Sequence, residues 1–263
     1  MNNPFLPKPY KIIDIKQETD LEYTFKIETD MAPYFGQFCQ VSIPKVGEAP
    51  ISICAYGDGW LDMTIRKVGT LTNKLFELSA GDTIFLRGPY GIGFNKDNYN
   101  GKHLIVVTGG TGLAPIKSLI NHFNDNIGDV KKFDLIMGFK NPDSVLFGDE
   151  IEKWKENIDT ILTVDEACGI WGDCVGLVTE HVATLELENL EEIEVIIVGP
   201  PMMMKFTALE FLKKGIAKDN IWVSFERNMS CALGKCGHCK IDETYVCIEG
   251  PVFRYSKAES LID

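Results

Sequence analysis

The chain has 263 residues and a formal net charge of -12, with 45% hydrophobic and 24% charged residues. This composition is typical of a globular protein, and the length favours two domains over one. The acidic charge repels nucleic acid phosphates and anionic membrane surfaces, and no local cluster of Lys or Arg offsets it. We therefore exclude nucleic acid and membranes as main partners.

The first ten residues contain three prolines and no continuous apolar stretch, unlike a signal peptide. No later segment approaches the roughly 18 consecutive apolar residues of a membrane helix. We therefore expect a cytoplasmic protein. Because cytoplasmic thiols stay reduced, metal or redox roles are favoured over disulfides for its eight cysteines.

The first third of the chain contains short runs of strand-forming residues, separated by turn residues and with little helix between them. This pattern predicts a small antiparallel β-barrel, with one short helix at residues 70–78. The expected strands cover residues 11–15, 23–27, 38–43, 50–55, 60–66 and 83–86.

After a stretch rich in Gly, Asn and Asp at residues 89–101, strands alternate with helices, which predicts a parallel sheet covered on both faces. The expected strands cover residues 103–108, 133–138, 160–164, 195–198 and 221–225, and the expected helices cover residues 115–123, 149–156, 178–185 and 202–214. Regular patterning then stops, and we expect the last forty or so residues to be organised by a metal rather than by a core.

Four cysteines near the C-terminus have the spacing of metal ligands. They are Cys231, Cys236, Cys239 and Cys247. Four thiolates satisfy either a 2Fe-2S cluster or a tetrahedral zinc ion, and the x4 then x2 spacing favours the loop of plant-type ferredoxins. Gly234 and Gly237 permit the backbone to approach the sulfurs closely. His238 is expected to be a surface neighbour, because four cysteines complete the ligand set.

Two strand ends carry glycines that suit a nucleotide pyrophosphate. Residues 104–108 form a buried strand that leads through Gly110, Thr111 and Gly112 into a helix with Pro115 at its first position. A second strand opens through Gly199 and Pro200 at the same edge of the predicted sheet, where ligands bind in such folds. The methionines at 202–204 are expected mainly to pack the following helix.

A third set of residues lies in the predicted barrel, at 49–52, at Arg66, at 69–72 and at 88–93. Hydroxyl groups and backbone donors at a helix start suit a second pyrophosphate, that of a flavin. Each segment alone is more often a turn or a cap. Their combination indicates a flavin site.

Together these motifs resemble the ferredoxin-NADP reductase superfamily, in the branch that carries a C-terminal 2Fe-2S lobe. Within that branch, four segments resemble the B subunits of anaerobic sulfite reductases: VGEAPIS at 46–52, YGDGW at 56–60, GPPM at 199–202 and GKCGHC at 234–239. The gamma subunits of sulfhydrogenases and the electron-transfer subunits of dihydroorotate dehydrogenases share this layout.

The resemblance implies an NAD(P)H-dependent flavin oxidoreductase subunit that holds FAD and a 2Fe-2S cluster and uses NADH as cosubstrate. Electrons would pass from NADH through FAD and the cluster to an iron-sulfur A subunit and a sirohaem C subunit that reduces sulfite to sulfide. The same chemistry in a sulfhydrogenase or a dihydroorotate dehydrogenase is the first alternative. An alternative of another class is a zinc-stabilised nucleotide-binding module without turnover.

The resemblance also divides the chain into an FAD-binding barrel at residues 1–98, an NAD(P)-binding α/β domain at 99–226 and a 2Fe-2S lobe at 227–263. It places Ser52 near the reactive edge of the flavin as a catalytic residue, with Pro50 and Ile51 beside it. The residues implied for the flavin pyrophosphate are Gly69, Thr70 and Thr72, and those implied for the nicotinamide nucleotide are Gly110, Thr111, Gly112, Gly199 and Pro200.

Some positions depart from the family pattern or lie open to two interpretations. The family's flavin motif is Arg-x-Tyr-Ser, and residues 49–52 here read APIS, so Arg66 is the candidate for the missing charge. Glu226, with its neighbour Arg227, is either a catalytic residue facing the nicotinamide or part of a solvated pair. Preference for NADH rests on the resemblance alone, because the second strand of the sheet ends at Lys140 and not at an acid. Cys168 and Cys174 are expected to be ordinary reduced thiols, with an accessory redox pair as the alternative.

Overall fold

The computed structural model describes residues 3–167, 169 and 171–262. The chain forms two compact units, Met1–Phe94 with Glu226–Pro251, and Asn95–Phe225 with Val252–Asp263. Neither unit is continuous in sequence. In the described part of the chain, no helix is both long and apolar enough to cross a membrane.

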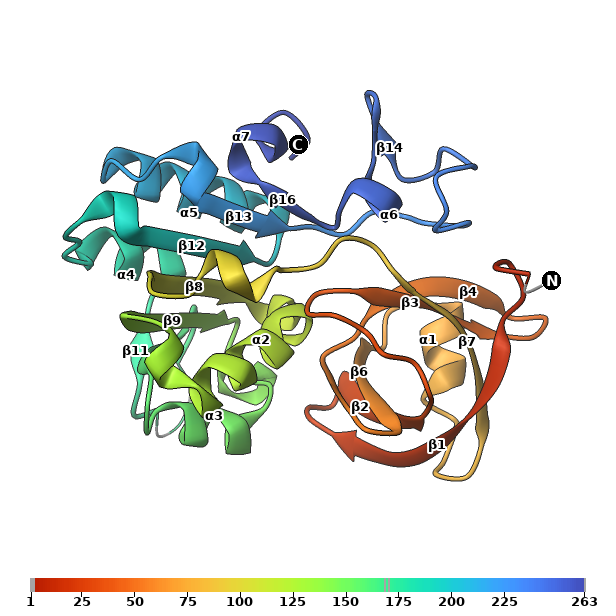
Figure 1. The fold of residues 1–263 in the computed structure, drawn as a ribbon. Helices are drawn as coiled ribbons and strands as arrows, with labels where there is room; N and C mark the ends of the chain where they lie inside the picture. The colour runs from red at the N-terminus through yellow and green to blue at the C-terminus, as the bar shows by residue number, and fades with distance from the viewer. Residues whose placement is uncertain (1–2, 168, 170, 263) are drawn as a thin grey trace. The chain divides into compact units, whose positions relative to one another are not determined.

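The first unit contains an antiparallel barrel, as the sequence predicts (Figure 1). Its strands, in the order in which they pair, are β4 (Gly47–Ser52), β3 (Phe38–Ile43), β7 (Thr83–Tyr90), β1 (Lys8–Gln17), β2 (Glu22–Glu28), β6 (Trp60–Arg66) and β5 (Ala55–Gly57). The run expected at 50–55 is divided between β4 and β5 because the chain changes partners there. The N–H of Ile53 donates to Gln37 O at 2.9 Å, and the N–H of Cys54 donates to Asp62 O at 2.9 Å.

Alternating residues of these strands fill the barrel. The fully buried members include Ile12, Phe25, Ile27, Val41, Leu61 and Met63. Helix α1 (Thr70–Leu75) follows β6 and buries Leu71 and Leu75 against this core. Just after α1, the ring of Phe76 stacks on that of Tyr23 with centroids 4.2 Å apart. The apolar period of two along each strand therefore accounts for the barrel.

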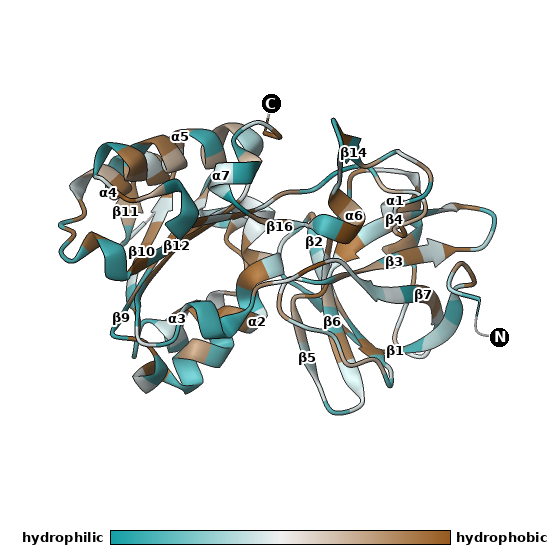
Figure 2. Ribbon diagram, turned by 45° about the horizontal axis from the view of Figure 1, so that its top comes forward, coloured by the Kyte–Doolittle hydropathy of each residue, from teal (hydrophilic) through white to brown (hydrophobic). Residues whose placement is uncertain are grey.

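The second unit contains a sheet with helices on both faces (Figure 1). Its strands, in spatial order, are β11 (Cys174–Val175), β10 (Asp159–Val164), β9 (Lys132–Phe139), β8 (His103–Gly109), β12 (Ile193–Val198), β13 (Ile221–Ser224) and β16 (Val252–Arg254). All neighbours pair in parallel except β13 and β16. Its central strands appear brown in Figure 2 because they are buried on both faces.

Helices α2 (Leu113–Asp125) and α3 (Gly148–Trp154) lie together on one face. Trp154 Nε1 donates to Asn121 Oδ1 at 2.8 Å, and Lys117 Nζ lies 2.8 Å from Glu150 Oε1. Helices α4 (Val178–Thr184) and α5 (Pro201–Lys213) also lie together, where Lys214 Nζ donates to Ala183 O at 2.8 Å. Short 3-10 turns occur at Lys96–Asn98, Gly110–Gly112, Ile127–Asp129, Pro142–Ser144, Leu190–Glu192 and Lys218–Asn220.

The C-terminal residues contain more regular structure than the sequence predicts. Residues 226–251 include β14 (Lys240–Ile241), β15 (Thr244–Tyr245) and α6 (Val246–Glu249). The chain then returns to the parallel sheet, where β16 pairs with β13 and is followed by α7 (Tyr255–Ala258). Phe253 stacks on Phe225 with ring centroids 5.2 Å apart, so this return buries a second aromatic ring. A three-residue strand is too short for its period to be recognised in sequence.

Gly93→Ala tests the packing after β7, where the chain leaves the barrel. A Cβ at position 93 would lie 1.9 Å from Phe35 O, the same oxygen that accepts the N–H of Phe94 at 2.7 Å. Backbone must therefore shift, and we expect a loss of roughly 1–3 kcal/mol, or about 2–4 °C in thermal midpoint per kcal/mol. The control is Gly148→Ala, because its Cβ meets nothing within 4 Å at the start of α3. An unchanged midpoint for Gly93→Ala, measured by circular dichroism, would contradict this packing.

Candidate functional site

The four candidate metal ligands lie in one segment, residues 229–247, which we call the cysteine loop. Backbone N–H groups point at their sulfurs. Those that lie 3.4 Å from Cys231 Sγ belong to Leu233, Lys235 and Cys236. The N–H of Gly234 lies 3.2 Å from Cys247 Sγ. Hydrogen bonds of this kind stabilise thiolates that carry the charge of an iron-sulfur cluster.

The conformation of the cysteine loop follows from four residues with positive φ. They are Ala232 at 58°, Gly234 at 67°, Gly237 at 81° and Asp242 at 47°. Left-handed residues reverse the direction of the chain over a short distance, so successive N–H groups turn to the same side. At position 234 a Cβ would also lie 2.7 Å from Ile248 Cδ1, which makes glycine the suitable residue.

The pKa values of two of the thiols are shifted in opposite directions. The pKa of Cys236 is lowered to about 7, first by the backbone N–H of His238 and also by hydrogen bonds with Cys231. The pKa of Cys247 is raised to about 12, first by burial and then by a hydrogen bond with the Cys239 thiol. Cys239 and Cys247 are buried, whereas Cys236 and His238 are exposed.

Four thiolates satisfy either a tetrahedral zinc ion or a 2Fe-2S cluster, in which each iron takes two of them. The N–H groups that point at Cys231 Sγ and Cys247 Sγ suit the sulfurs of a cluster, because such hydrogen bonds stabilise its negative charge.

The predicted nucleotide residues meet at one edge of the parallel sheet. The chain runs from β8 to β9 on one side, while β12 pairs with β8 on the other side, so the strand order reverses between β8 and β12. Ligands of such sheets bind at this reversal, beyond the carboxyl ends of the strands. The 3-10 turn Gly110–Gly112 follows β8, and Gly199 and Pro200 follow β12.

Glycine is required where these two strand ends meet. A Cβ at Gly112 would lie 2.4 Å from Val198 O, and one at Gly109 would lie 2.3 Å from Met203 Sδ. Gly110, by contrast, has a φ of 54° and open space in front of it. The turn therefore packs tightly on one side and is accessible on the other. Helix α2 begins at Leu113, so Pro115 is its third residue and not its first.

Two acidic residues at this sheet were missed from sequence. Asp165 and Glu166 follow β10, and their N–H groups donate to Phe139 O at 2.9 Å and to Lys140 O at 3.1 Å. Burial, and then the charge of Glu166, raise the pKa of Asp165. The end of β10 thus carries the carboxylates that the end of β9 lacks. The sequence feature that could have identified them is an acidic pair directly after the strand predicted at residues 160–164.

The predicted flavin residues lie in the barrel unit, on β4 and around the start of α1. Pro50 and Ser52 lie on one face of β4, and Ile51 lies on the opposite face, packed against the barrel core. Gly69 is the residue before α1, and a Cβ there would meet nothing within 4 Å. Thr70 is exposed. Open space before the first turn fits the approach of a phosphate group.

Two members of the flavin set already have partners. The hydroxyl of Thr72 accepts the N–H groups of Val68 and Gly69, both at 2.9 Å, so it shapes the turn before α1. Arg66 Nε lies 3.2 Å from Glu22 Oε1, with its side chain 51% exposed. That exposure leaves the guanidinium accessible from solvent.

The remaining candidate residues are scattered. Glu226 and Arg227 are exposed residues just after β13. Cys174 is exposed on β11, whereas Cys168 lies outside the described residues. Burial raises the pKa of Cys39 to about 12, which is consistent with a structural thiol in the barrel core.

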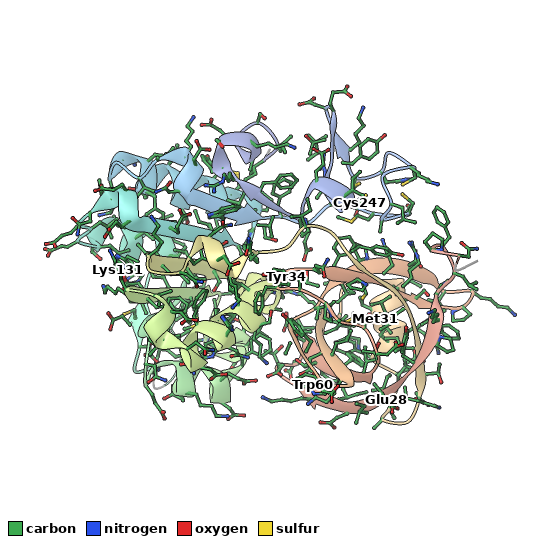
Figure 3. The ribbon with its side chains drawn as sticks, in the orientation of Figure 1. Glu28, Met31, Tyr34, Trp60, Lys131 and Cys247 are labelled. Atoms are coloured by element: carbon green, nitrogen blue, oxygen red, sulfur yellow. The ribbon has the colours of Figure 1, made fainter. Side chains whose placement is uncertain are left out.

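A cavity of about 860 Å³ opens at the end of the barrel near Glu28 and Met31, both labelled in Figure 3. It is also lined by Tyr10 and Tyr56. The pKa of Tyr56 is raised to about 12 by burial and then by Tyr34, so its phenol stays neutral. The residues that line this cavity do not include the predicted cofactor residues, and we assign no cofactor to it.

Two family models match the chain. The oxidoreductase NAD-binding domain matches residues 106–208, and the iron-sulfur cluster binding domain of dihydroorotate dehydrogenase B matches residues 226–259. An NADH-dependent reduced ferredoxin-NADP oxidoreductase has the same fold, with a TM-score of 0.79 and 23% identity over 94% of this chain and 88% of that chain. The fold and the matched domains define an oxidoreductase with a ferredoxin-NADP reductase-like fold, an NAD-binding domain and an iron-sulfur domain.

Two similar proteins span nearly the whole chain. The gamma subunit of sulfhydrogenase 2 from Pyrococcus furiosus is 34% identical over 98% of this chain and 98% of its own. The probable electron-transfer subunit of dihydroorotate dehydrogenase B (NAD(+)) from Thermococcus kodakarensis is 33% identical over 96% of this chain and 100% of its own. The chain belongs to the family of these subunits.

These comparisons confirm the predicted fold class and the predicted cofactors, FAD, NADH and an iron-sulfur cluster. They support the alternative of a sulfhydrogenase or dihydroorotate dehydrogenase subunit better than the narrower resemblance to sulfite reductase.

Gly112→Ala tests the nucleotide edge of the parallel sheet. The added methyl group must displace either the turn after β8 or the end of β12. We expect the Kd for the nicotinamide nucleotide to rise roughly tenfold to a hundredfold, because small displacements in a binding turn are costly. Isothermal titration gives the Kd, and flavin content should stay unchanged. The control Gly128→Ala places its Cβ in open space, and equal effects of both variants would contradict the assignment.

Proposed function

We propose that this chain is the NADH-oxidising electron-transfer subunit of a larger redox complex. It takes hydride from NADH onto FAD and passes single electrons through a 2Fe-2S cluster to a partner subunit. The observation that carries this proposal is the arrangement of the cysteine loop, in which backbone N–H groups point at the sulfurs of Cys231 and Cys247.

The chain's own residues bind and orient the reactants. Gly110, Thr111 and Gly112, with Gly199 and Pro200, line the nucleotide, and the amide groups at the start of α2 face its pyrophosphate. When bound, FAD accepts hydride and releases single electrons, and the cluster carries one electron at a time. The protein needs no bond-breaking residue of its own for this reaction.

The flavin is proposed to lie along the outer part of the barrel. Gly69 and Thr70 supply the turn for its pyrophosphate, Thr72 fixes that turn, and Arg66 supplies the charge. Ser52 lies at its reactive edge with Pro50, while Ile51 supports that edge from the core side. Glu226 is proposed to face the nicotinamide. The division at residues 98 and 226 and the cytoplasmic location remain predictions.

We propose NADH over NADPH because of Asp165 and Glu166. These carboxylates follow β10, next to Lys140 at the end of β9. A carboxylate near the adenosine ribose accepts hydrogen bonds from its hydroxyl groups and repels a 2'-phosphate. The one positive charge of Lys140 is outweighed there by the two negative charges of Asp165 and Glu166.

The partner is proposed to be a catalytic subunit of the sulfhydrogenase or dihydroorotate dehydrogenase kind, as the names of the similar proteins suggest. A second candidate is a sulfite reductase, with an iron-sulfur A subunit and a sirohaem C subunit. It is favoured by the segments VGEAPIS, YGDGW, GPPM and GKCGHC. In the reconstituted complexes, NADH-dependent reduction of sulfite, NADH-dependent reduction of protons, and reduction of NAD+ by dihydroorotate distinguish these partners.

The visible spectrum of anaerobically purified protein tests the proposed route. We expect flavin bands over the broad absorption of an iron-sulfur cluster, and bleaching of both by NADH much faster than by NADPH. Iron and zinc are measured on the same sample. A colourless protein that contains zinc would instead support the nucleotide-binding module without turnover.

Cys236→Ser separates hydride transfer from electron exit. We expect iron to fall to background and the electron paramagnetic resonance (EPR) signal of the NADH-reduced cluster to disappear. Reduction of FAD by NADH, followed by stopped flow, should stay close to the parent rate because it needs only the flavin and the nucleotide. Cys174→Ser, at an exposed thiol outside the cysteine loop, is the matched control. If flavin reduction disappeared together with the cluster, the proposed separation of roles would be wrong.

A further inference from the structure

Two buried side chains of the barrel, Gln40 on β3 and Arg87 on β7, reach the start of the cysteine loop. They are directly paired across the two strands and are 0% and 6% exposed. Gln40 Nε2 donates to Met229 O at 3.3 Å. Arg87 donates to Ser230 O at 2.6 Å through Nη2 and to Cys231 O at 2.5 Å through Nη1. Three consecutive carbonyl groups, ending at the first candidate ligand, therefore point at the barrel.

The carbonyl groups held by the barrel fix the backbone on both sides of Cys231. A trans peptide directs its N–H opposite to its C=O, so an oxygen held by the barrel turns the next N–H away from the barrel. The N–H groups that follow the three held oxygens are those of Ser230, Cys231 and Ala232. The Cys231 sulfur carried by this backbone lies 3.4 Å from the N–H groups of Leu233, Lys235 and Cys236. Gln40 and Arg87 therefore position the sulfur that accepts these N–H groups.

Arg87 is fixed in place by Glu48 on β4. Nε lies 3.0 Å from Glu48 Oε2, and Nη2 contacts Oε1 of the same carboxylate. Burial lowers the pKa of Arg87, but hydrogen bonds and the charge of Glu48 outweigh burial and raise it. The side chain of Glu48 is 26% exposed. A permanent cation therefore lies against the cysteine loop, with one carboxylate on its far side.

The reduction potential of an iron-sulfur cluster depends on its net charge, on hydrogen bonds to its sulfurs and on its exposure. We propose that Gln40 and Arg87 are positioning residues that raise the reduction potential of the cluster, and that Glu48 opposes Arg87 electrostatically. This inference rests on the cluster proposed above. The reduced cluster carries one more negative charge, so oriented N–H donors and a nearby cation stabilise it, and a carboxylate destabilises it.

Two substitutions that each remove one charge should shift the reduction potential in opposite directions, which a merely structural role would not produce. Arg87→Gln removes the cation and should lower the equilibrium constant for one-electron reduction about tenfold, or about 59 mV. Glu48→Gln keeps a hydrogen-bonding side chain beside Arg87, removes the negative charge and should raise the constant by several-fold. Arg87→Lys keeps the charge and should recover most of the loss. Gln40→Leu should lower the constant less than Arg87→Gln.

The measurement is an anaerobic redox titration of the full chain with its cofactors, followed by EPR of the reduced cluster. Lys11→Gln is the matched control, because Lys11 is an exposed cation of the same barrel whose Nζ donates to a backbone carbonyl, Gly81 O, at 2.9 Å. We expect its potential to equal that of the parent. Iron content and thermal midpoint are recorded for every variant.

The outcomes separate this inference from the proposed function. A parent protein without iron or EPR signal overturns the proposed function itself. A parent with the cluster overturns the inference alone if Arg87→Gln and Glu48→Gln shift the potential in the same direction, or if neither exceeds Lys11→Gln. If Arg87→Gln fails to assemble a cluster, Glu48→Gln decides: an upward shift supports the inference, and no shift overturns it.

Discussion

The cysteine loop depends on how its peptide groups are oriented. Four thiolates close together repel one another, and N–H donors and nearby cations offset that repulsion. A short loop with four left-handed residues has too little core of its own to hold such donors in place. The barrel supplies the restraint, because Gln40 and Arg87 bind the carbonyl oxygens at the loop entrance. The loop therefore requires both its metal centre and the barrel wall.

At the predicted nucleotide edge, the turn after β8 is held by close packing of glycines and not by buried polar side chains. There two strand ends must come close to each other, and Gly109, Gly112 and Gly199 each lie where a Cβ would contact Met203 or the end of β12. The tight packing of β8 against β12 fixes the turn, and Gly110 leaves its outer side open. Helix α2 begins directly after this turn, and the positive end of its dipole suits an anion.

Much of the fold could be predicted from sequence because strand and helix periods are local signals. Strands β3 and β6 lie at the predicted residues, and the alternation of strands and helices gave the parallel sheet. The split between β4 and β5 could not be predicted, since it depends on which strands Ile53 and Cys54 bind. The return of β16 to the sheet rests on three residues and on the stacking of Phe253 on Phe225.

The residues of the candidate sites likewise divide into those that could be found from sequence and those that could not. Cysteine spacing and glycine turns are visible in sequence because the chemistry fixes residue type at short range. Asp165 and Glu166 could have been found, because they directly follow a predicted strand. Gln40 and Arg87 could not: they lie about 190 and 140 positions from the carbonyl groups that they bind, and nothing local marks either residue.

Strand β4 connects the flavin and cluster arguments. Glu48 and Pro50 lie opposite Ser42 and Gln40 of β3, so their side chains share the face on which Gln40 and Arg87 reach the cysteine loop. The strand proposed to meet the flavin therefore also holds the carboxylate that fixes Arg87. A site built on regular strands is held more precisely than one on loops, and one-electron transfer benefits from a fixed separation of donor and acceptor. A change in β4 would then affect both the flavin contact and the cation beside the cysteine loop.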